Sequence, residues 1–342
     1  MPISSNKPLV IPIFIPYSGC PHRCVFCNQA ALTGSTTPIP DPVEIKNIIT
    51  RFLQFKKPFR KPIEVSFFGG NFLGLDPKII STLMAPVIPF LERVEIDSVR
   101  FSTRPDTITE KTLSLIEQYP VSCIELGVQS MDDAILARCR RGHTSADTKN
   151  AVALIKKRGY GLGLQVMVGL PGETREVTMS TGAAIAALKP DFVRIYPTLV
   201  IADSALAAWY KNGKYTPLCL DECIDRVKAL YLMFTAKNIR VIRMGLQANE
   251  ELDSGAAVLA GPYHPAFGHM VLSEIMLDKV KSAINQIGDA SRRLLLSVHP
   301  SCVSRMQGLK KNNLDRLKKE FGFKEIQIIA DPLVVPDHVV VS

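Results

Sequence analysis

The chain has 342 residues, of which 46% are hydrophobic and 21% are charged, and this balance excludes a disordered or fibrous protein. The apolar run at Leu9–Ile15 is too short to cross a bilayer and lacks the flanks of a signal peptide, so we expect a cytoplasmic protein with no membrane segment. The formal net charge is +9, and residues 292–324 hold nine Lys or Arg against two acids. Such a basic stretch suggests a polyanionic partner, although a solvated helix face would also carry it.

Six short apolar strands, each followed by a loop and a segment of helical period, are predicted between residue 9 and about residue 197. Near-continuous apolar runs of this kind are typical of parallel strands buried on both faces. The helices between them begin at N-cap residues followed by proline or a capping-box acid, as at Asp41, Asp76 and Thr144. The six strands are Leu9–Ile15, Ile63–Phe68, Ser98–Thr103, Val121–Leu126, Leu162–Val168 and Phe192–Tyr196.

The remaining chain predicts a seventh strand and then a different, smaller unit. The seventh strand is expected at Val241–Leu246, and a long helix begins beyond about residue 270. A strand at Leu294–Val298, a basic helix at Ser304–Phe321 and two short strands follow. Serial strand–helix units imply a parallel α/β architecture with right-handed crossovers. We therefore divide the chain into a core at residues 1–247 and a small α/β extension at residues 248–342.

Three of the eight cysteines, Cys20, Cys24 and Cys27, lie within eight residues directly after the first strand. This concentration indicates a metal site, because a disulfide framework would spread its pairs and the cytosol keeps thiols reduced. The spacing C-x3-C-x2-C can hold three corners of a cubane iron–sulfur cluster and leave the fourth iron open. The alternative is a zinc site completed by His22 or a distant histidine. Phe26, beside the last cysteine, either shields the site or fills the core.

Downstream of the cysteines, six further motifs each lie at the carboxyl end of a predicted strand or in the loop after it. In barrels of parallel strands, the active site lies at the end of the barrel where the carboxyl ends of the strands meet. The motifs are Phe68-Gly69-Gly70-Asn71, Ser102-Thr103-Arg104-Pro105-Asp106, Glu125-Leu126-Gly127-Val128-Gln129-Ser130, Arg141-Gly142-His143-Thr144, Gly169-Leu170-Pro171-Gly172 and Arg194-Ile195-Tyr196-Pro197-Thr198-Leu199-Val200.

In this order the motifs resemble the radical S-adenosylmethionine (SAM) superfamily, in particular its elongator-type subgroup, over roughly residues 9–247. They are similar, more distantly, to oxygen-independent coproporphyrinogen oxidase. The resemblance implies an α/β fold, a partial (β/α)6 TIM-like parallel barrel of radical SAM type with a small C-terminal α/β extension. The extension does not resemble an acetyltransferase half, so we expect a protein other than the two-domain elongator subunit.

The resemblance also implies roles for individual residues. The three cysteines would ligate a [4Fe-4S] cluster, whose fourth iron is chelated by the amino and carboxylate groups of SAM. Glycine at positions 69 and 70 would let the backbone approach the SAM amino group. Two positions depart from the pattern, since relatives often have Glu at the place of Ser102 and Glu, Thr or Ser at that of Asn71. The expected SAM-binding residues are Phe26, Gly69, Gly70, Asn71, Ser102, Gln129, Arg141 and Gln165.

Each of these residues also has a purely structural interpretation. The pair Gly69-Gly70 would make an ordinary strand-end turn, Gln129 a satisfied polar residue and Arg141 a surface charge. We interpret His143 and His299 as structural histidines. The segment Gly261–His269 is expected as a loop at the barrel mouth, where Tyr263 and His264 would either serve the reaction or belong to a rigid, proline-pinned turn.

For such a chain the resemblance implies reductive cleavage of SAM to methionine and a 5′-deoxyadenosyl radical, with electrons from a donor such as flavodoxin or ferredoxin. Three hypotheses remain for the substrate. The first is modification of RNA, in particular tRNA, in keeping with the elongator-like pattern and the basic helix headed by residues 308–313. The second is a small-molecule radical reaction, such as porphyrin or cofactor chemistry. The third is a non-catalytic iron–sulfur protein, against which the intact Gly69-Gly70 and Arg141 argue.

Overall fold

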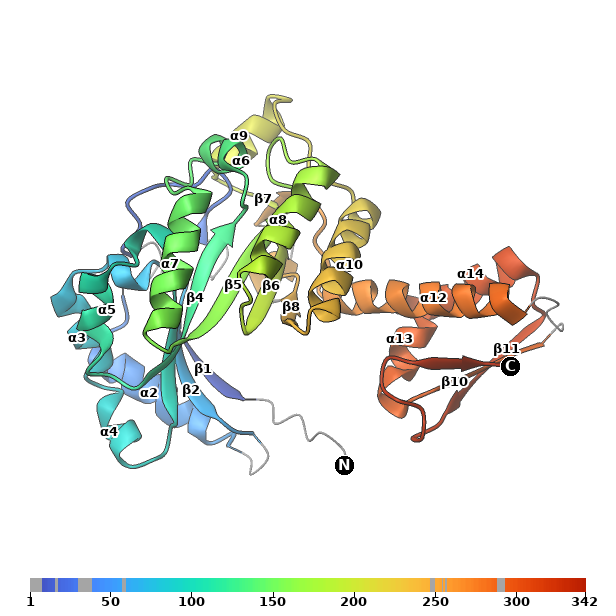
Figure 1. Ribbon diagram of the computed structural model, residues 1–342, viewed down its shortest axis with the longest axis horizontal. Helices are drawn as coiled ribbons and strands as arrows, with labels where there is room; N and C mark the ends of the chain where they lie inside the picture. Colours follow the sequence, from blue (N-terminus) through green and yellow to red (C-terminus); the bar gives the residue numbers. More distant parts are fainter. Residues whose placement is uncertain are drawn as a thin grey trace.

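The computed structural model describes residues 8–15, 18–29, 39–56, 60–246, 250–253, 255, 257–287 and 293–342. Within this part of the chain the main element is a curled, seven-stranded parallel sheet in the order β1-β2-β3-β4-β5-β6-β8 (Figure 1). The predicted parallel half-barrel is thus confirmed. Its strands are β1 (Leu9–Phe14), β2 (Ile63–Phe68), β3 (Ser98–Thr103), β4 (Val121–Gln129), β5 (Gly161–Val168), β6 (Phe192–Pro197) and β8 (Arg240–Met244).

Helices cover the outer, convex face of this sheet. The predicted N-caps are present: Asp41 accepts from two backbone N–H groups, Asp76 from one, and Thr144 forms a reciprocal capping box with Asp147. The helices of the main body are α2 (Pro42–Leu53), α3 (Pro77–Met84), α4 (Ile88–Glu92), α5 (Glu110–Ile116), α6 (Asp133–Arg138), α7 (Ser145–Lys157), α8 (Arg175–Ala187), α9 (Ala205–Lys211), α10 (Leu220–Ala236) and α11 (Glu250–Asp253).

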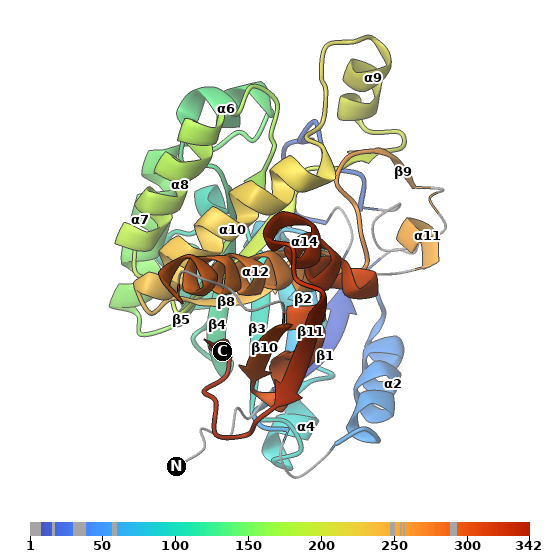
Figure 2. The same cartoon turned by 90° about the vertical axis from the view of Figure 1, so that its right-hand side faces the viewer.

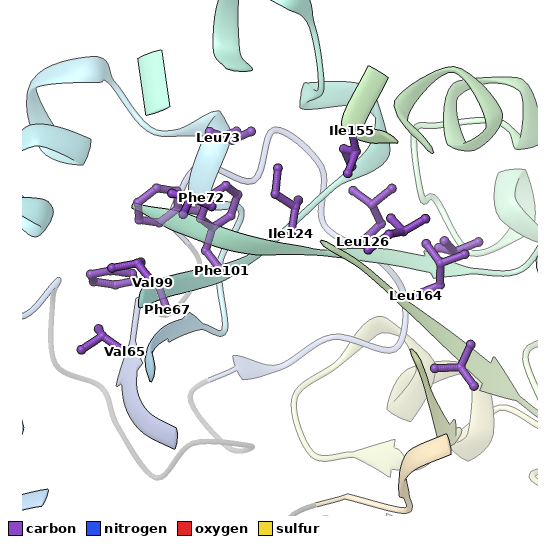
Figure 3. Packing of buried hydrophobic residues seen from close by; sticks show 14 of the residues in the cluster. Val65, Phe67, Phe72, Leu73, Val99, Phe101, Ile124, Leu126, Ile155 and Leu164 are labelled. Carbon is purple, nitrogen blue, oxygen red and sulfur yellow. The ribbon is translucent and has the colours of Figure 1, made fainter. Parts of the chain in front are cut away.

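Beneath these helices the convex face of the sheet is mainly apolar. Alternate residues of each strand point into the cluster, among them Phe67 on β2 and Phe101 on β3, both with no exposed surface (Figure 3). The ring of Phe72, which follows β2, stacks on that of Phe101 with 4.4 Å between centroids. Because side chains alternate along a strand, the residues between these apolar positions face the other side.

The concave face of the sheet is buried or half-buried at most positions and carries many polar side chains. Arg194 on β6 reaches across β5 to Glu125 on β4, with 2.8 Å between Nε and Oε2, and its guanidinium lies over the Phe68 ring on β2. Hydrophobic residues of the strands thus alternate with polar residues, several of which pair with one another across the concave face. The polar residues of this face are Glu64, Ser66, Arg100, Ser102, Glu125, Gln129, Gln165, Arg194, Tyr196 and Arg243.

The extension is attached through one long helix, α12 (Phe267–Ile287), which runs out from the main body (Figure 1). Phe267 and Val271 near its start belong to the main cluster, whereas Val280 and Ile284 belong to a second cluster inside the extension. Figure 2, seen from the extension, shows α12 beside α10, where Lys228 Nζ lies 2.7 Å from Asp278 Oδ2. The helix therefore contributes side chains to two hydrophobic cores.

A three-stranded sheet in the order β11-β10-β12 completes the extension, together with two short helices. The central strand pairs parallel with β11 and antiparallel with β12. The elements are β10 (Arg293–Val298), α13 (Val303–Gln307), α14 (Asn312–Phe321), β11 (Glu325–Ala330) and β12 (Val339–Val341).

The basic helix predicted from Ser304 to Phe321 is broken into α13 and α14. Gly308, Lys310 and Lys311 all have positive φ, at 72°, 51° and 66°, which no continuous helix allows. The buried Asn313 side chain holds this break, because its Nδ2 donates to Ser273 O on α12 and to Arg305 O at the end of α13. A tertiary contact thus overrides helical propensity, and Lys311 lies at the break instead of on one helix face with Lys318.

Two further observations complete the fold. The loop expected at residues 261–269 ends earlier: β9 (Val258–Ala260) precedes it, pairing antiparallel with β7 (Val200–Ile201), and α12 already begins at Phe267. None of the helices in the described residues is both long and apolar enough to cross a bilayer.

Candidate active site

The cysteine loop lies directly after β1, at the carboxyl end of the sheet. Cys24 is buried, while Cys20 and Cys27 are half-buried. Burial raises the pKa of the Cys27 thiol to about 12, and the two neighbouring thiols add to this rise. Burial also raises the pKa of Cys20, against the opposing charge of Arg141. Any metal bound here must therefore displace protons from the thiols. Among the described residues, no three His, Cys, Asp or Glu side chains converge on a single metal position.

Arg141 joins this loop to the sheet from the segment after α6. Its Nη1 donates to Cys24 Sγ at 3.3 Å, and its Nη2 donates to the backbone oxygen of Gly127 on β4 at 2.6 Å. The side chain is buried, and its Nε has no hydrogen-bond partner in the described structure. Gly127 lets both side chains approach the strand, because a Cβ would lie 2.9 Å from Arg141 Nη2 and from Gln129 Nε2 and would force them to shift. The buried guanidinium of Arg141 thus lies beside Cys24, and its Nε–H group has no partner within the described structure.

The two glutamines predicted for SAM meet on the concave face. Gln165 Nε2 on β5 donates to Gln129 Oε1 at 2.9 Å. Gln129 is buried with φ of 68°, and the β4–β5 pairing shifts register between Gly127 and Gln129. A buried, non-glycine residue in the left-handed region is costly and is typical of a functional position.

Gly70 and Asn71 hold the loop after β2 against the cysteine loop. A Cβ on Gly70 would lie 2.4 Å from Ile15 O and 2.6 Å from Ser18 O, so only glycine fits. Asn71 has no exposed surface; its Nδ2 donates to Gly19 O at 2.7 Å, and its Oδ1 accepts from Arg104 N at 3.0 Å. The Asn71 side chain therefore connects three loops at the carboxyl end of the sheet.

Two other predicted residues lie at the edges of this arrangement. Ser102 is half-buried on the concave face of β3, level with Glu125 on β4. Phe26 is half-buried and packs against a small apolar cluster that includes Val25 and Cys139. His143, interpreted from sequence as structural, is buried beside Arg141 and Arg104, and burial lowers its pKa to about 4. Its ring is therefore neutral at pH 7.

Comparison with known families decides what this arrangement is. The chain matches the radical SAM superfamily over residues 14–181 and the radical SAM C-terminal domain over residues 190–276. The protein belongs to the radical SAM superfamily. A tRNA uridine(34) acetyltransferase of Methanocaldococcus jannaschii is 27% identical over 271 residues, covering 66% of this chain and 50% of the relative.

Two further proteins are similar to this radical SAM enzyme. The heme chaperone HemW of Lactococcus lactis is 25% identical over 199 residues, covering 58% of this chain and 51% of that protein. The solved structure of the archaeal Methanocaldococcus infernus Elp3 superposes with a TM-score of 0.61 at 21% identity, covering 84% of this chain and 65% of that one, and it supports the fold. The chain spans about half the length of the two curated relatives named here.

Radical SAM enzymes bind a [4Fe-4S] cluster and SAM, and the residues present fit both groups. The donor set consists of three thiols in one loop, as a cubane with one open iron needs. The unpartnered Nε of Arg141 is a buried donor for an anionic group. When bound, the cluster supplies the electron that splits SAM into methionine and a 5′-deoxyadenosyl radical.

Sequence reasoning missed the residues that brace the cysteine loop of this radical SAM enzyme. The brace is the insertion after β6, formed by β7 and α9. Leu206 N donates to Val25 O at 2.7 Å, and Asn28 Nδ2 donates to Ala202 O at 2.7 Å. Asn28 directly follows Cys27 and carried a usable signal, because short polar side chains often fix loops. The Leu206 contact uses only backbone atoms, so no sequence pattern could have revealed it.

Proposed function

We propose that this protein cleaves SAM at a [4Fe-4S] cluster bound by Cys20, Cys24 and Cys27 and uses the resulting radical to modify tRNA. The relatives named as tRNA uridine(34) acetyltransferases support RNA as the substrate class. The observation that carries the proposal is a set of exposed lysines on the extension, described below.

Within the proposed site, each residue acts through the contacts already described. Arg141 would hold the SAM carboxylate with its free donor, and the backbone at Gly69 and Gly70 would receive the amino group. Gln129 and Gln165 would contact the ribose from the concave face. Phe26 would cover the cluster, while Asn71 and Ser102 would shape the polar cradle.

Four lysines of the extension, Lys310, Lys311, Lys318 and Lys319, are exposed and are called the tail lysines. None of them forms an ion pair in the described part of the chain. Other cations of the same unit are paired, as Arg305 is with Asp337 and Arg316 is with Glu274. Unpaired surface cations attract the phosphates of a polyanion, so the tail lysines suit an RNA backbone.

We further propose residues 1–247 as the radical SAM core and residues 248–342 as the RNA-binding extension. The core would receive its electron from a donor such as flavodoxin or ferredoxin in the cytoplasm.

The test is anaerobic SAM cleavage and tRNA binding by the reconstituted protein, with total tRNA as the probe. Addition of tRNA should stimulate formation of 5′-deoxyadenosine. Replacing all four tail lysines with Gln should weaken tRNA binding. It should also make the slope of log K against log salt less negative by up to about three to four, through lost counterion release.

A matched control carries the same change of charge on the main body, where the lysines are equally exposed: Lys46, Lys78, Lys111 and Lys149. This control should bind tRNA like the parent. Equal tRNA affinity of the tail variant and the parent at every salt concentration would contradict an RNA-binding extension. Stimulation by a porphyrin and not by tRNA would favour the small-molecule reaction instead.

A further inference from the structure

Two phenylalanines end neighbouring strands on the concave face, next to the Gly69-Gly70 loop. Phe14 is the last residue of β1 and Phe68 the last of β2, and their Cα atoms are partners in the strand pairing. Their rings are tilted by 41° with 6.3 Å between centroids. Phe14 is 44% exposed, whereas Ile11 and Ile13 of the same strand have no exposed surface. We call Phe14 and Phe68 the aromatic shelf.

Arg194, from the opposite side of the half-barrel, lies against the Phe68 ring of this shelf. The Arg194 guanidinium lies 5.2 Å from the centroid of the Phe68 ring, within range of a cation–π interaction. Arg194 is fixed by Glu125, and its Nη1 donates to the hydroxyl of Tyr196 at 3.3 Å. Arg194 and Tyr196 thus stand near the rings with hydrogen-bonding groups.

Two of the cations on the concave face are paired with carboxylates of the same face. Arg100 Nη1 lies 3.6 Å from Glu64 Oε2 and 3.7 Å from Glu125 Oε1, and Arg194 pairs with Glu125. Arg243 on β8 lies level with Arg194, so three guanidinium groups share this face with two carboxylates. The choice of ligand therefore follows from the two aromatic rings, which suit a planar ring.

We propose that the aromatic shelf stacks against an unpaired nucleobase of the RNA substrate, with Arg194 and Tyr196 facing its polar edge. This inference rests on the proposed function and names where the reacting base lies. Every base presents a face that can stack on an aromatic side chain. Chemistry on a base also requires that the base leave its helix or loop stack. The shelf adjoins Gly69, beside the proposed SAM site, so a stacked base would lie close to SAM.

The test compares Phe14→Leu, which keeps apolar bulk without a ring, with Phe14→Tyr, which keeps the ring. Turnover with total tRNA is measured as kcat/KM for 5′-deoxyadenosine formation. Phe14→Leu should lower kcat/KM by about 5- to 150-fold, the range expected for one lost stacking contact. Phe14→Tyr should stay within a few-fold of the parent. Because Phe14 is exposed, both variants should fold, and circular dichroism melting checks this.

A matched control is Phe55→Leu, which should leave kcat/KM unchanged. Phe55 is 60% exposed and lies just after the end of α2, outside the shelf. Tyr and Leu variants of Phe14 with equal kcat/KM would overturn the shelf while leaving tRNA as the substrate. A parallel loss of SAM affinity, measured by equilibrium dialysis without RNA, would also overturn it, by placing the adenine of SAM on the shelf. A parent enzyme that tRNA does not stimulate would overturn the proposed function and the shelf together.

Discussion

The two faces of the seven-stranded sheet are made by the same strands and have opposite characters. On the convex face, Phe67, Phe72 and Phe101 pack ring against ring with no exposed surface. On the concave face, Arg194 and Glu125 form a buried ion pair. Because successive side chains of a strand alternate, one face provides stability from apolar burial while the other is free to carry chemistry. Substitutions on the two faces should therefore fail in different ways.

The largest effect is expected at the cluster loop. Cys24→Ala should remove essentially all bound iron and sulfide after anaerobic reconstitution, because a cubane with two protein thiolates is poorly held. Cys302→Ala is the control, since Cys302 is buried in the extension's own cluster and should leave the iron content unchanged. Iron and sulfide assays measure both. Tightly bound zinc in the parent protein would contradict the cluster assignment.

A core substitution on the convex face should cost stability and nothing else. Phe101→Ala removes a fully buried ring that stacks on Phe72, so the free energy of unfolding should fall by about 3–5 kcal/mol. Urea unfolding followed by circular dichroism measures this loss. At a temperature where the variant remains folded, its SAM affinity should equal that of the parent. A large change in SAM affinity would show that the two faces are not separable.

Arg141→Ala tests the opposite case, in which binding falls while the fold remains. Loss of its charged hydrogen bonds should weaken SAM binding by about 1.5–3 kcal/mol, or roughly ten- to a hundredfold, as measured by equilibrium dialysis. Arg141→Lys should recover only part of this, because an ammonium group cannot reach Cys24 Sγ and Gly127 O with separate fixed donors. Unchanged SAM affinity in both variants would place the SAM carboxylate elsewhere.

The last prediction concerns Glu173, which lies in the loop between β5 and α8. Burial raises its pKa to about 7, although Oε2 accepts from the backbone N–H groups of Gly169 and Leu170. Because the folded-state pKa exceeds the ordinary value of 4.5, the folded protein binds the proton more tightly. The free energy of unfolding should then fall as pH rises from about 4.5 to 7.

The comparison for this effect is Glu173→Gln, which cannot titrate and should flatten the pH dependence in that window. Urea unfolding at several pH values gives the measurement. Parallel pH profiles for the variant and the parent would show that Glu173 does not contribute to it.

The sequence predicted what is local and left out what depends on distant residues. Strand positions and the caps at Asp41, Asp76 and Thr144 follow from neighbouring residues, and the structure has them. The break between α13 and α14 depends on Asn313, whose partner Ser273 lies 40 positions away. No local pattern encodes that contact.

The same limit applies to the candidate site. The cysteine spacing and the glycines at 69 and 70 predicted the superfamily that the family match shows, whereas the roles of these residues stay a prediction. The sequence did not show that Arg194 pairs with Glu125, since that pair requires the sheet to curl. The exposure of Phe14 was equally hidden, because its strand reads as uniformly apolar.

The long helix α12 has a consequence for how the molecule folds and for how it can be cut. Phe267, Val271 and Ile275 fill the main core, and the next turns of the same helix fill the extension's core. A chain ended at residue 247 would lose those three anchors and expose the apolar surface beneath them. The main body and the extension should consequently unfold together in one cooperative thermal transition, and not as two independent domains.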